Sequence, residues 1–391
     1  MTAYIRINGL IKSLLLFTVI TSGLGAQYAG RERHWWFTLE TGKNLFRQGA
    51  YGEALTSFQD ARNERRELYS NMERDLIILF SLPEVRRMND SLEQIEAYIN
   101  ERGQINAATA LAELYYRVGR AALRNSARLA LEHIDRLKSY PEADYWIGET
   151  YRLMGENEIA LRQFNEALSA ADSMENPGLT VEVHYKIAEI ERLRQRYGEM
   201  ENHLLTILER DTLWKQDDGA FVREAMSRTI ENGGINRFLQ MYRYKNAETE
   251  KAHRLLGRYF YDSEQYEKAF PHLTFAFLIQ NTTIIDEIIA EQFDFKFTNT
   301  EAMMRAITRR PAVMDYVTKV DFYKTAYYLA ATLQARGKTA VARELFDFLS
   351  ARDDAGEWQE RGSRPAASVL SPTASGTIGA LIDGYGHISH Y

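Results

Sequence analysis

Side chains that could bind a metal or carry out catalysis are few in this sequence of 391 residues. Helical carboxylate metal sites use a Glu-x-x-His spacing, which places both side chains on one face of a helix. The pattern occurs once, at Glu250-Lys251-Ala252-His253. Because a di-iron bundle needs the motif twice, with two further inward-facing glutamates, we interpret this copy as a helix-surface pair.

Other signatures of chemistry are missing from the sequence. It contains no Gly-x-x-x-x-Gly-Lys loop, no Gly-x-Gly-x-x-Gly, no His-Glu-x-x-His and no Gly-x-Ser-x-Gly. Asp217-Asp218-Gly219 lacks the alternating ligands and terminal Glu of a calcium loop, and His387 and His390 lie in a Gly- and Ser-rich stretch. The absence of cysteine excludes disulfides, thiolate metal ligands and a catalytic thiol. We therefore predict a non-enzymatic protein with no catalytic residue, no metal and no cofactor.

The composition is typical of a helical protein. The sequence has only 7 prolines, 45% hydrophobic residues and 26% charged residues. This indicates short turns and solvent-exposed outer helix faces. The 48 basic and 54 acidic residues are interspersed along the chain. This balance argues against a surface that binds nucleic acid.

The N-terminus predicts export. Arg6 and Lys12 flank the start of an apolar run at residues 14–20, and small residues follow up to Ala26. This is the pattern of a secretory signal peptide, which we assign to residues 1–25 with cleavage near Gly25 or Ala26. The run is shorter than the ~20 residues of a membrane-spanning helix, so an uncleaved anchor is the weaker alternative. Without a cysteine to carry lipid, we expect a soluble protein of the periplasm or cell envelope.

One set of residue types recurs at constant offsets along the chain. Each copy starts with a small residue, and the other positions are counted from it. A large residue lies three positions later, a turn residue seven positions later, an Ala 12 positions later and a large residue 16 positions later. The first copy reads Gly42, Leu45, Gly49, Tyr51, Ala54, Phe58, Ala61, and further copies start at Gly148, Gly257, Ala188 and Ala330. Offsets of three and four place residues on one helix stripe, so each copy predicts two helices joined by a turn, a helical hairpin.

These copies resemble the tetratricopeptide repeat family, most clearly at Trp146-Ile147-Gly148-Glu149-Thr150-Tyr151 and Tyr266-Glu267-Lys268-Ala269-Phe270. The resemblance implies a right-handed all-α solenoid over residues 26–350. The gaps between copies leave room for four more hairpins of ~34 residues, giving about nine. Their predicted helix pairs are 67–80 with 83–101, 105–118 with 125–138, 220–231 with 235–246, and 284–293 with 300–309. Residues 351–391 are expected to form a flexible tail or a short binding peptide.

The family's first helices line a concave groove. The resemblance places groove residues three before, one after and four after each small residue. In this sequence these are Leu39, Lys43 and Phe46; Tyr145, Glu149 and Arg152; Tyr185, Glu189 and Arg192; Arg254, Arg258 and Tyr261; and Tyr327, Ala331 and Gln334. Tyr and Arg are common in protein interfaces, although Glu149–Arg152 and Glu189–Arg192 are also ordinary intrahelical pairs.

The leading hypothesis is a scaffold that binds a partner protein or peptide, similar to the tetratricopeptide proteins that assemble outer-membrane, secretion or spirochaete-type flagellar machinery. A chaperone-type carboxylate clamp is not predicted, because Leu39 and Lys43 occupy its places in the first copy. The alternative is a small-ligand-binding protein associated with a transport system, with a cavity lined by Tyr259, Phe260, Tyr261, Phe275 and Phe277. A remote alternative is an envelope hydrolase with one catalytic glutamate on a helical solenoid, as in lytic transglycosylases.

Overall fold

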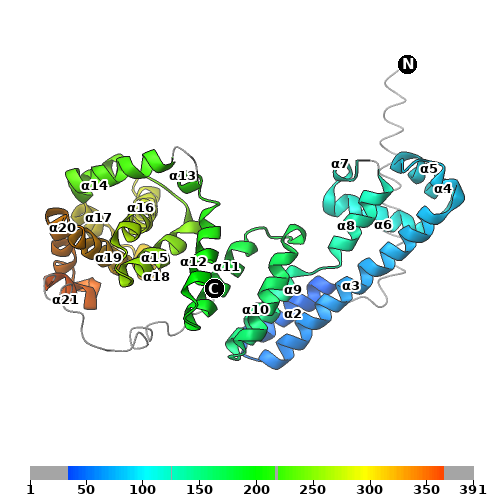
Figure 1. The fold of residues 1–391 in the computed structure, drawn as a ribbon, viewed down its shortest axis with the longest axis horizontal. Coiled ribbons are helices and arrows are strands. Elements are labelled where there is room, and N and C mark those ends of the chain that lie inside the picture. The colour runs from blue at the N-terminus through cyan, green and yellow to red at the C-terminus, as the bar shows by residue number, and fades with distance from the viewer. Residues whose placement is uncertain (1–33, 125, 216–218, 365–391) are drawn as a thin grey trace, which may run out of the picture. The chain divides into compact units, whose positions relative to one another are not determined.

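The chain is all-helical wherever its structure is described. The computed structural model describes residues 34–124, 126–215 and 219–364, and these ranges contain helices and connections but no strand (Figure 1). The predicted signal peptide and the last part of the predicted tail, residues 365–391, lie outside them. The chain divides into two compact units, Met1–Val183 and His184–Tyr391, with the boundary inside helix α11.

Unit 1 contains two of the predicted motif-bearing hairpins, α2–α3 and α9–α10, with shorter helices between them in sequence. Its helices are α2 (Trp35–Arg47), α3 (Tyr51–Ser81), α4 (Pro83–Arg86), α5 (Leu92–Arg102), α6 (Ile105–Val118), α7 (Arg120–Leu123), α8 (Ala127–Leu137), α9 (Pro141–Leu153), α10 (Asn157–Ser169), the 3₁₀ turn η1 (Ala171–Ser173) and the start of α11 (Leu179–Leu193).

Unit 2 contains the hairpins α15–α16 and α19–α20, and α12, which follows α11 after another predicted turn. Its further helices are α12 (Tyr197–Leu208), α13 (Thr212–Lys215), α14 (Gly219–Met241), α15 (Ala247–Asp262), α16 (Tyr266–Glu291), α17 (Thr300–Ile307), α18 (Pro311–Lys319), α19 (Phe322–Ala335), α20 (Thr339–Ser350), η2 (Asp353–Ala355) and α21 (Glu357–Ser363).

The five predicted hairpin turns share one backbone geometry. The residue at offset seven has a positive φ in every copy: Gly49, Gly155, Gln195, Glu264 and Gly337, with φ between 60° and 85°. The next residue donates its N–H to the carbonyl five residues earlier, as from Ala50 to Leu45 (3.0 Å) and from Gln265 to Phe260 (2.7 Å). This is the Schellman C-cap, which satisfies carbonyls at the helix end. The position seven residues after the first residue of each copy therefore marks structurally equivalent turns.

Replacing Gln195 or Glu264 with glycine is expected to stabilise unit 2. Both residues hold a left-handed conformation, with φ of 60°, that glycine adopts without a Cβ penalty. We expect each substitution to raise the free energy of unfolding by about 0.5–1 kcal/mol, measured by urea denaturation of the protein. The matched control is Gly337→Ala at the equivalent turn, which should lower it. A loss of stability on both glycine substitutions would contradict the C-cap assignment.

Small residues bring the two helices of a hairpin into close contact. A Cβ on Gly42 would lie 2.6 Å from the Phe58 ring, one on Gly148 would lie 2.8 Å from the Phe164 ring, and one on Gly257 would lie 2.6 Å from Leu273. In each pair, the small first residue of a copy contacts the large residue 16 positions later, on the second helix. A side chain larger than that of glycine would not fit there, which explains why the pattern pairs a small residue with a large one.

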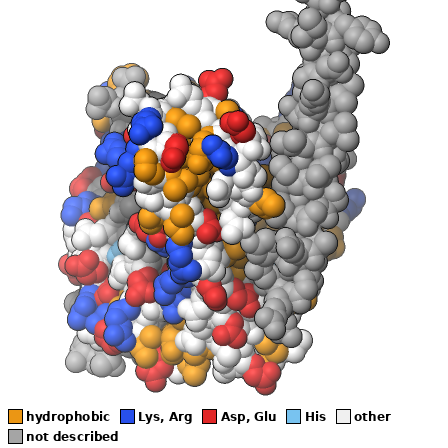
Figure 2. All heavy atoms as spheres, turned by 90° about the vertical axis from the view of Figure 1, so that its right-hand side faces the viewer, with side chains coloured by type: hydrophobic (Ala, Val, Ile, Leu, Met, Phe, Trp, Pro, Cys, Tyr) orange, Lys and Arg blue, Asp and Glu red, His pale blue; other side chains and the backbone are white. Residues whose placement is uncertain are grey.

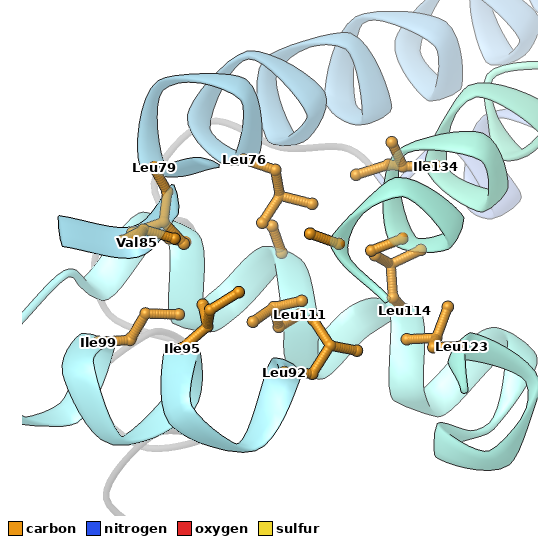
Figure 3. Close-up of a cluster of buried hydrophobic side chains, with 14 of the residues drawn as sticks. Leu76, Leu79, Val85, Leu92, Ile95, Ile99, Leu111, Leu114, Leu123 and Ile134 are labelled. Carbon is orange, nitrogen blue, oxygen red and sulfur yellow. The ribbon is translucent and has the colours of Figure 1, made fainter. Parts of the chain in front are cut away.

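The first pair of predicted extra helices does not form. Residues 67–80 belong to α3, which continues to Ser81 because no glycine or proline interrupts it after Gly52. The segment predicted at 83–101 divides into α4 and α5. The extension of α3 has a packing role, since Leu76 and Leu79 enter a hydrophobic cluster with side chains of α5, α6 and α8 (Figure 3).

The same turn geometry occurs once where no motif was predicted. Gly103 has a φ of 64°, and Gln104 donates its N–H to the carbonyl of Ile99 at 3.1 Å. The turn joins α5 to α6, whereas the sequence had paired α6 with the helix at 125–138. Glu96 stands where the other copies have Gly or Ala, which hid this hairpin.

In unit 2 one further prediction is corrected and another is confirmed. Residues 284–293 continue α16 to Glu291 and form no separate helix, while 300–307 form α17. The predicted break at Asn232-Gly233-Gly234 is present, because Gly234 (φ 76°, ψ 174°) leaves the helical conformation within α14. The Glu344 carboxylate accepts the Ile235 N–H at 3.1 Å beyond this break. With two expected pairs absent, the tally of nine hairpins is wrong.

The predicted start of the tail at residue 351 is wrong. Residues 353–363 form η2 and α21, and Gly362 is buried against Leu349 and Phe346 of α20. Helical structure therefore extends to Ser363, beyond the predicted boundary at Ser350.

α16 is the central helix of unit 2. It is long and apolar enough to cross a membrane by length and composition, but 72% of its most apolar window is buried within the protein. Its residues from Ala269 to Ala276 are almost all buried. This is the pattern of a core helix in a packed helical unit.

Candidate partner-binding surface

In unit 1 the predicted groove residues are largely engaged by neighbouring helices. Leu39 and Phe46 are buried, and the Phe46 ring lies 5.3 Å from the Trp146 ring of α9. Lys43 is half-buried, pairs with Glu40 at 2.6 Å and lies over the Trp146 ring. The structure thus places Phe46 in the hydrophobic core rather than on an open groove.

In the second set of predicted groove residues, Glu149 and Arg152 form an ion pair within one helix, which was the alternative interpretation of the sequence. Tyr145 and Glu149 are buried, and the Arg152 guanidinium donates to both Glu149 oxygens, at 2.7 and 2.8 Å. Burial raises the pKa of Tyr145, and Glu182 and Glu149 add to the effect. This Glu–Arg pair is a bidentate contact within α9.

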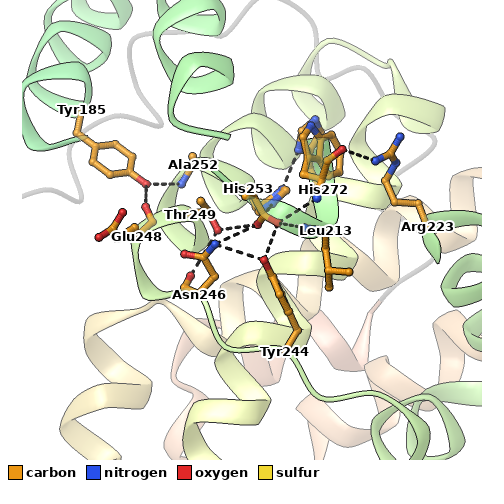
Figure 4. Close-up of polar contacts among 12 residues, drawn as sticks. Tyr185, Leu213, Arg223, Tyr244, Asn246, Glu248, Thr249, Ala252, His253 and His272 are labelled. Carbon is orange, nitrogen blue, oxygen red and sulfur yellow. Dashed lines mark hydrogen bonds and ion pairs between the residues drawn. The ribbon is translucent and has the colours of Figure 1, made fainter. Parts of the chain in front are cut away.

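Tyr185 has a structural role in unit 2. It is buried, its hydroxyl donates to the Glu248 carbonyl at 2.6 Å, and it accepts the Ala252 N–H at 2.9 Å (Figure 4). These bonds attach α11 to the first turns of α15. Glu189 and Arg192, on the same helix, are half-buried.

Two residues of the fourth predicted set line a pocket. Arg254 and Arg258 of α15, both predicted groove residues, line it together with Lys324 and Tyr328 of α19. Leu255, Leu273 and Thr325 complete the lining, so it contains three cations and no carboxylate. The enclosed cavity is only about 10 Å³, about the space that one water molecule needs. This is far below the ~300–1,000 Å³ of small-molecule sites, so a partner's side chain would contact the mouth of the pocket rather than enter it.

The arginines of the lining pair with carboxylates that are not part of it. Arg254 donates to Glu250 at 3.1 Å and to Asp321 at 2.9 Å, and Arg258 lies 3.6 Å from Asp262. Burial lowers the pKa of Lys324, and the neighbouring Arg258 lowers it further. Burial also raises the pKa of Asp262, against the effect of Arg258. Both arginines therefore have carboxylate partners within the protein.

Sequence reasoning missed Lys324 and Tyr328. They lie six and two residues before Ala330, outside the offsets carried over from the family. Tyr261 and Tyr327 were predicted, and both pack near the pocket. The Tyr261 ring lies 5.1 Å from Tyr328, and the Tyr327 ring lies 5.3 Å from Trp358 of α21. A signal was available in the charge pattern of α19, where Lys324 is its only charged residue.

The Glu-x-x-His pair is buried, so its interpretation as a helix-surface pair is wrong. Glu250 accepts from Gln280 at 2.6 Å, and burial raises the pKa of Glu250. His253 points into a different network, with its Nδ1 3.1 Å from His272 Nδ1 and its Nε2 3.6 Å from Asp211 (Figure 4). Within the described ranges, no three His, Asp or Glu side chains are arranged to hold a metal.

The aromatic residues of the proposed ligand cavity are mostly packing residues. Phe260, Phe275 and Phe277 are buried, and Phe275 packs against Trp214 and His253. Tyr259 stacks on Tyr197 of α12 at 5.6 Å. These contacts fill the space that a ligand would need.

A histidine pair recurs at the same repeat positions in two hairpins. His184 and His203 lie four before and fifteen after Ala188, and His253 and His272 have the same offsets from Gly257. Their Nδ1 atoms are 2.9 and 3.1 Å apart. One Nδ1 must donate and the other accept, so the two rings of a pair cannot both be protonated in this arrangement.

We expect acid to destabilise unit 2 through these pairs. Burial lowers the pKa of all four histidines, that of His184 to about 4. The unfolded chain takes up protons near pH 6.5 and the folded unit does not, so the free energy of unfolding should fall as pH drops from about 6.5 toward 4. Urea denaturation at pH 7 and pH 5 measures the effect. His184→Gln should reduce this pH dependence; an unchanged slope would contradict the assignment.

Comparisons with known proteins give relatives without a described function. No family model matches this chain, and no solved structure matches it. An uncharacterized protein of Treponema pallidum is 22% identical over 337 residues, covering 86% of this chain and 90% of the relative. One of Borreliella burgdorferi is 20% identical over 215 residues, covering 50% of this chain and 66% of that protein. The longer alignment exceeds either unit, so the similarity extends over parts of both.

The surface is mixed in charge on the face that Figure 2 displays. Acidic and basic side chains are interspersed there, with hydrophobic side chains between them. The lining of the pocket between α15 and α19 contains cations and no carboxylate, although Glu250, Asp321 and Asp262 pair with its arginines.

Proposed function

We propose that this chain is an exported, non-enzymatic scaffold that binds a partner protein in the cell envelope, through one face of a tetratricopeptide-like right-handed solenoid. The observation that carries the proposal is the pocket at which Arg254 and Arg258, selected by repeat phase, meet Lys324 and Tyr328. Such residues favour a partner's acidic side chain.

The repeated hairpin geometry supports the solenoid part of the proposal. Equivalent Schellman turns and close Gly–Phe or Gly–Leu contacts recur through both units. Hairpins of this kind bury their apolar faces against neighbours, and their stacking produces extended concave binding surfaces. The export part rests on the N-terminal sequence pattern alone.

Photocrosslinking in cells tests the proposal. A photoreactive residue replaces Arg258 in the pocket, and the matched control carries it at Arg305, which lies outside the pocket on α17 with an exposed side chain. Cells are fractionated and adducts identified. We expect a reproducible adduct with an envelope protein at position 258 and not at 305.

Charge reversal at the same position gives a quantitative prediction. Arg258→Glu should weaken binding of the captured partner at least tenfold, because the pocket would lose a cation and gain a carboxylate. The control Arg305→Glu should bind as the unmodified protein does. Equal adducts at 258 and 305, or an affinity that Arg258→Glu leaves unchanged, would refute the pocket as the binding site.

A further inference from the structure

α21 occupies the part of unit 2 where a groove ligand was predicted. Its Trp358 ring lies 5.3 Å from Tyr327, a predicted groove residue, and 6.3 Å from Tyr328, which lines the pocket. Tyr327 and Tyr328 are both buried. The chain therefore places one of its own aromatic side chains against the aromatic wall of the candidate site.

The charges of α21 also match the site. Lys324, a pocket cation, lies 6.0 Å from the centre of the Trp358 ring, close enough for a cation–π contact. Glu357, the residue before Trp358, acts electrostatically to favour the charged form of Lys324. The segment Glu357-Trp358-Gln359-Glu360-Arg361 thus brings Glu357 and Trp358 toward this face, and Arg361 pairs with Glu357 at 2.8 Å and lies 4.8 Å from the centre of the Trp358 ring.

α21 is a short helix that packs mainly against α20. The helix has seven residues, too few to be stable by itself in water. It follows Gly356, whose φ of 56° and ψ of −130° lie in a region that is essentially restricted to glycine. Gln359 donates to the Ser350 carbonyl at 3.3 Å and to Asp353 at 3.1 Å. The docked position therefore depends on Trp358 and on the packing of Gly362 against α20.

We propose that the face formed by Lys324, Tyr327 and Tyr328 is the docking site for a partner's acidic, tryptophan-bearing helix, and that α21 is its occupant in the free protein. The partner displaces α21 on binding. This inference rests on the proposed function, because it names the chemistry of the partner and the regulation of the same surface.

A peptide supplied in trans tests the inference. The probe is a fluorescein-labelled peptide with the sequence of residues 353–364, titrated to 1 mM against the complete mature protein and followed by fluorescence polarisation. A segment tethered by a short linker has an effective concentration on the order of millimolar, so α21 docks only if its Kd is below about 1 mM. We expect Trp358→Ala, which empties the face, to bind the peptide at least tenfold more tightly than the unmodified protein.

A second variant keeps the test decisive if Trp358→Ala fails to fold. Glu357→Lys leaves Trp358 in place but puts a cation beside Lys324, so it should release α21 and also raise peptide affinity. Circular dichroism checks both variants. A peptide with alanine at the tryptophan position should not bind, and Lys324→Glu added to Trp358→Ala should lower the affinity at least fivefold.

The outcomes separate the two proposals. If neither variant binds the peptide more tightly than the unmodified protein, α21 is not a displaceable occupant, and the inference is overturned even if Arg258 still gives an envelope adduct. If the variants bind the peptide and Arg258 gives no adduct, the docking of α21 stands and the scaffold function fails.

Discussion

Replacing Arg65 with alanine should destabilise unit 1 by about 3–5 kcal/mol. The Arg65 side chain is 1% exposed, and its guanidinium lies beside the rings of Trp35 and Tyr140, 4.7 and 4.6 Å from their centres. Its Nε donates to the Leu137 carbonyl at 3.0 Å, and its Nη1 lies 3.0 Å from Glu175. Alanine would leave a cavity beside two aromatic rings and a carbonyl without its donor.

Hydrogen exchange measured by mass spectrometry is the suitable readout, because it reports unit 1 separately from unit 2. Peptides from α3 should exchange faster in Arg65→Ala, and peptides from α16 should not change. Arg65→Lys is the matched control. Lysine keeps the charge but lacks the planar guanidinium that contacts both rings, so an intermediate loss is expected. If Arg65→Ala exchanges as slowly as the unmodified protein, the guanidinium does not hold these helices together.

Replacing Asp211 with alanine should destabilise unit 2 by a similar amount, about 3–5 kcal/mol. The carboxylate is fully buried and accepts hydrogen bonds from the N–H groups of Leu213 and Trp214, both at 3.0 Å, and from the hydroxyls of Tyr244 (2.6 Å) and Thr249 (2.9 Å) (Figure 4). Removing it leaves these buried donors unsatisfied. Burial acts to raise the pKa of Asp211, but the contacts with His253 and Tyr244 hold it below its ordinary value.

Urea denaturation followed by exchange of α13 and α15 peptides measures the effect. Asp211→Asn is the control, since its carbonyl oxygen still accepts some of these bonds while the charge is lost, and it should cost less than alanine. The alanine variant should also raise the exchange rate of Trp214, whose ring packs 4.4 Å from His272. An alanine variant as stable as the asparagine variant would show that the unsatisfied donors find other partners.

The hairpins could be predicted from the sequence because their determinants are local. Each hairpin contains its own determinants: a small residue, a turn seven residues later and a large residue 16 residues later. The structure confirms five such turns. Extra helices inferred only from the length of the gaps were less successful. Residues 67–80 and 284–293 had no turn residue before them, so they extended α3 and α16.

The candidate site could be predicted only in part. Arg254 and Arg258 could be predicted from their positions in the repeat, since both belong to one helix face. Lys324 and Tyr328 reach the pocket from a different hairpin. Phase also selected Phe46 and Tyr185, which the structure buries against α9 and α15. Whether a groove position stays accessible depends on how the next helices pack, which the offsets do not encode.

By itself the sequence determined the all-helical class, the five turns and the absence of cysteine chemistry, because residue type and spacing fix these within about 20 positions. Tertiary structure alone decided that Glu250 and His253 are buried, that Asp211 gathers donors from residues 213–249, and that α21 covers Tyr327. Each of these depends on contacts between residues distant in sequence, where burial and charge follow from packing rather than from pattern.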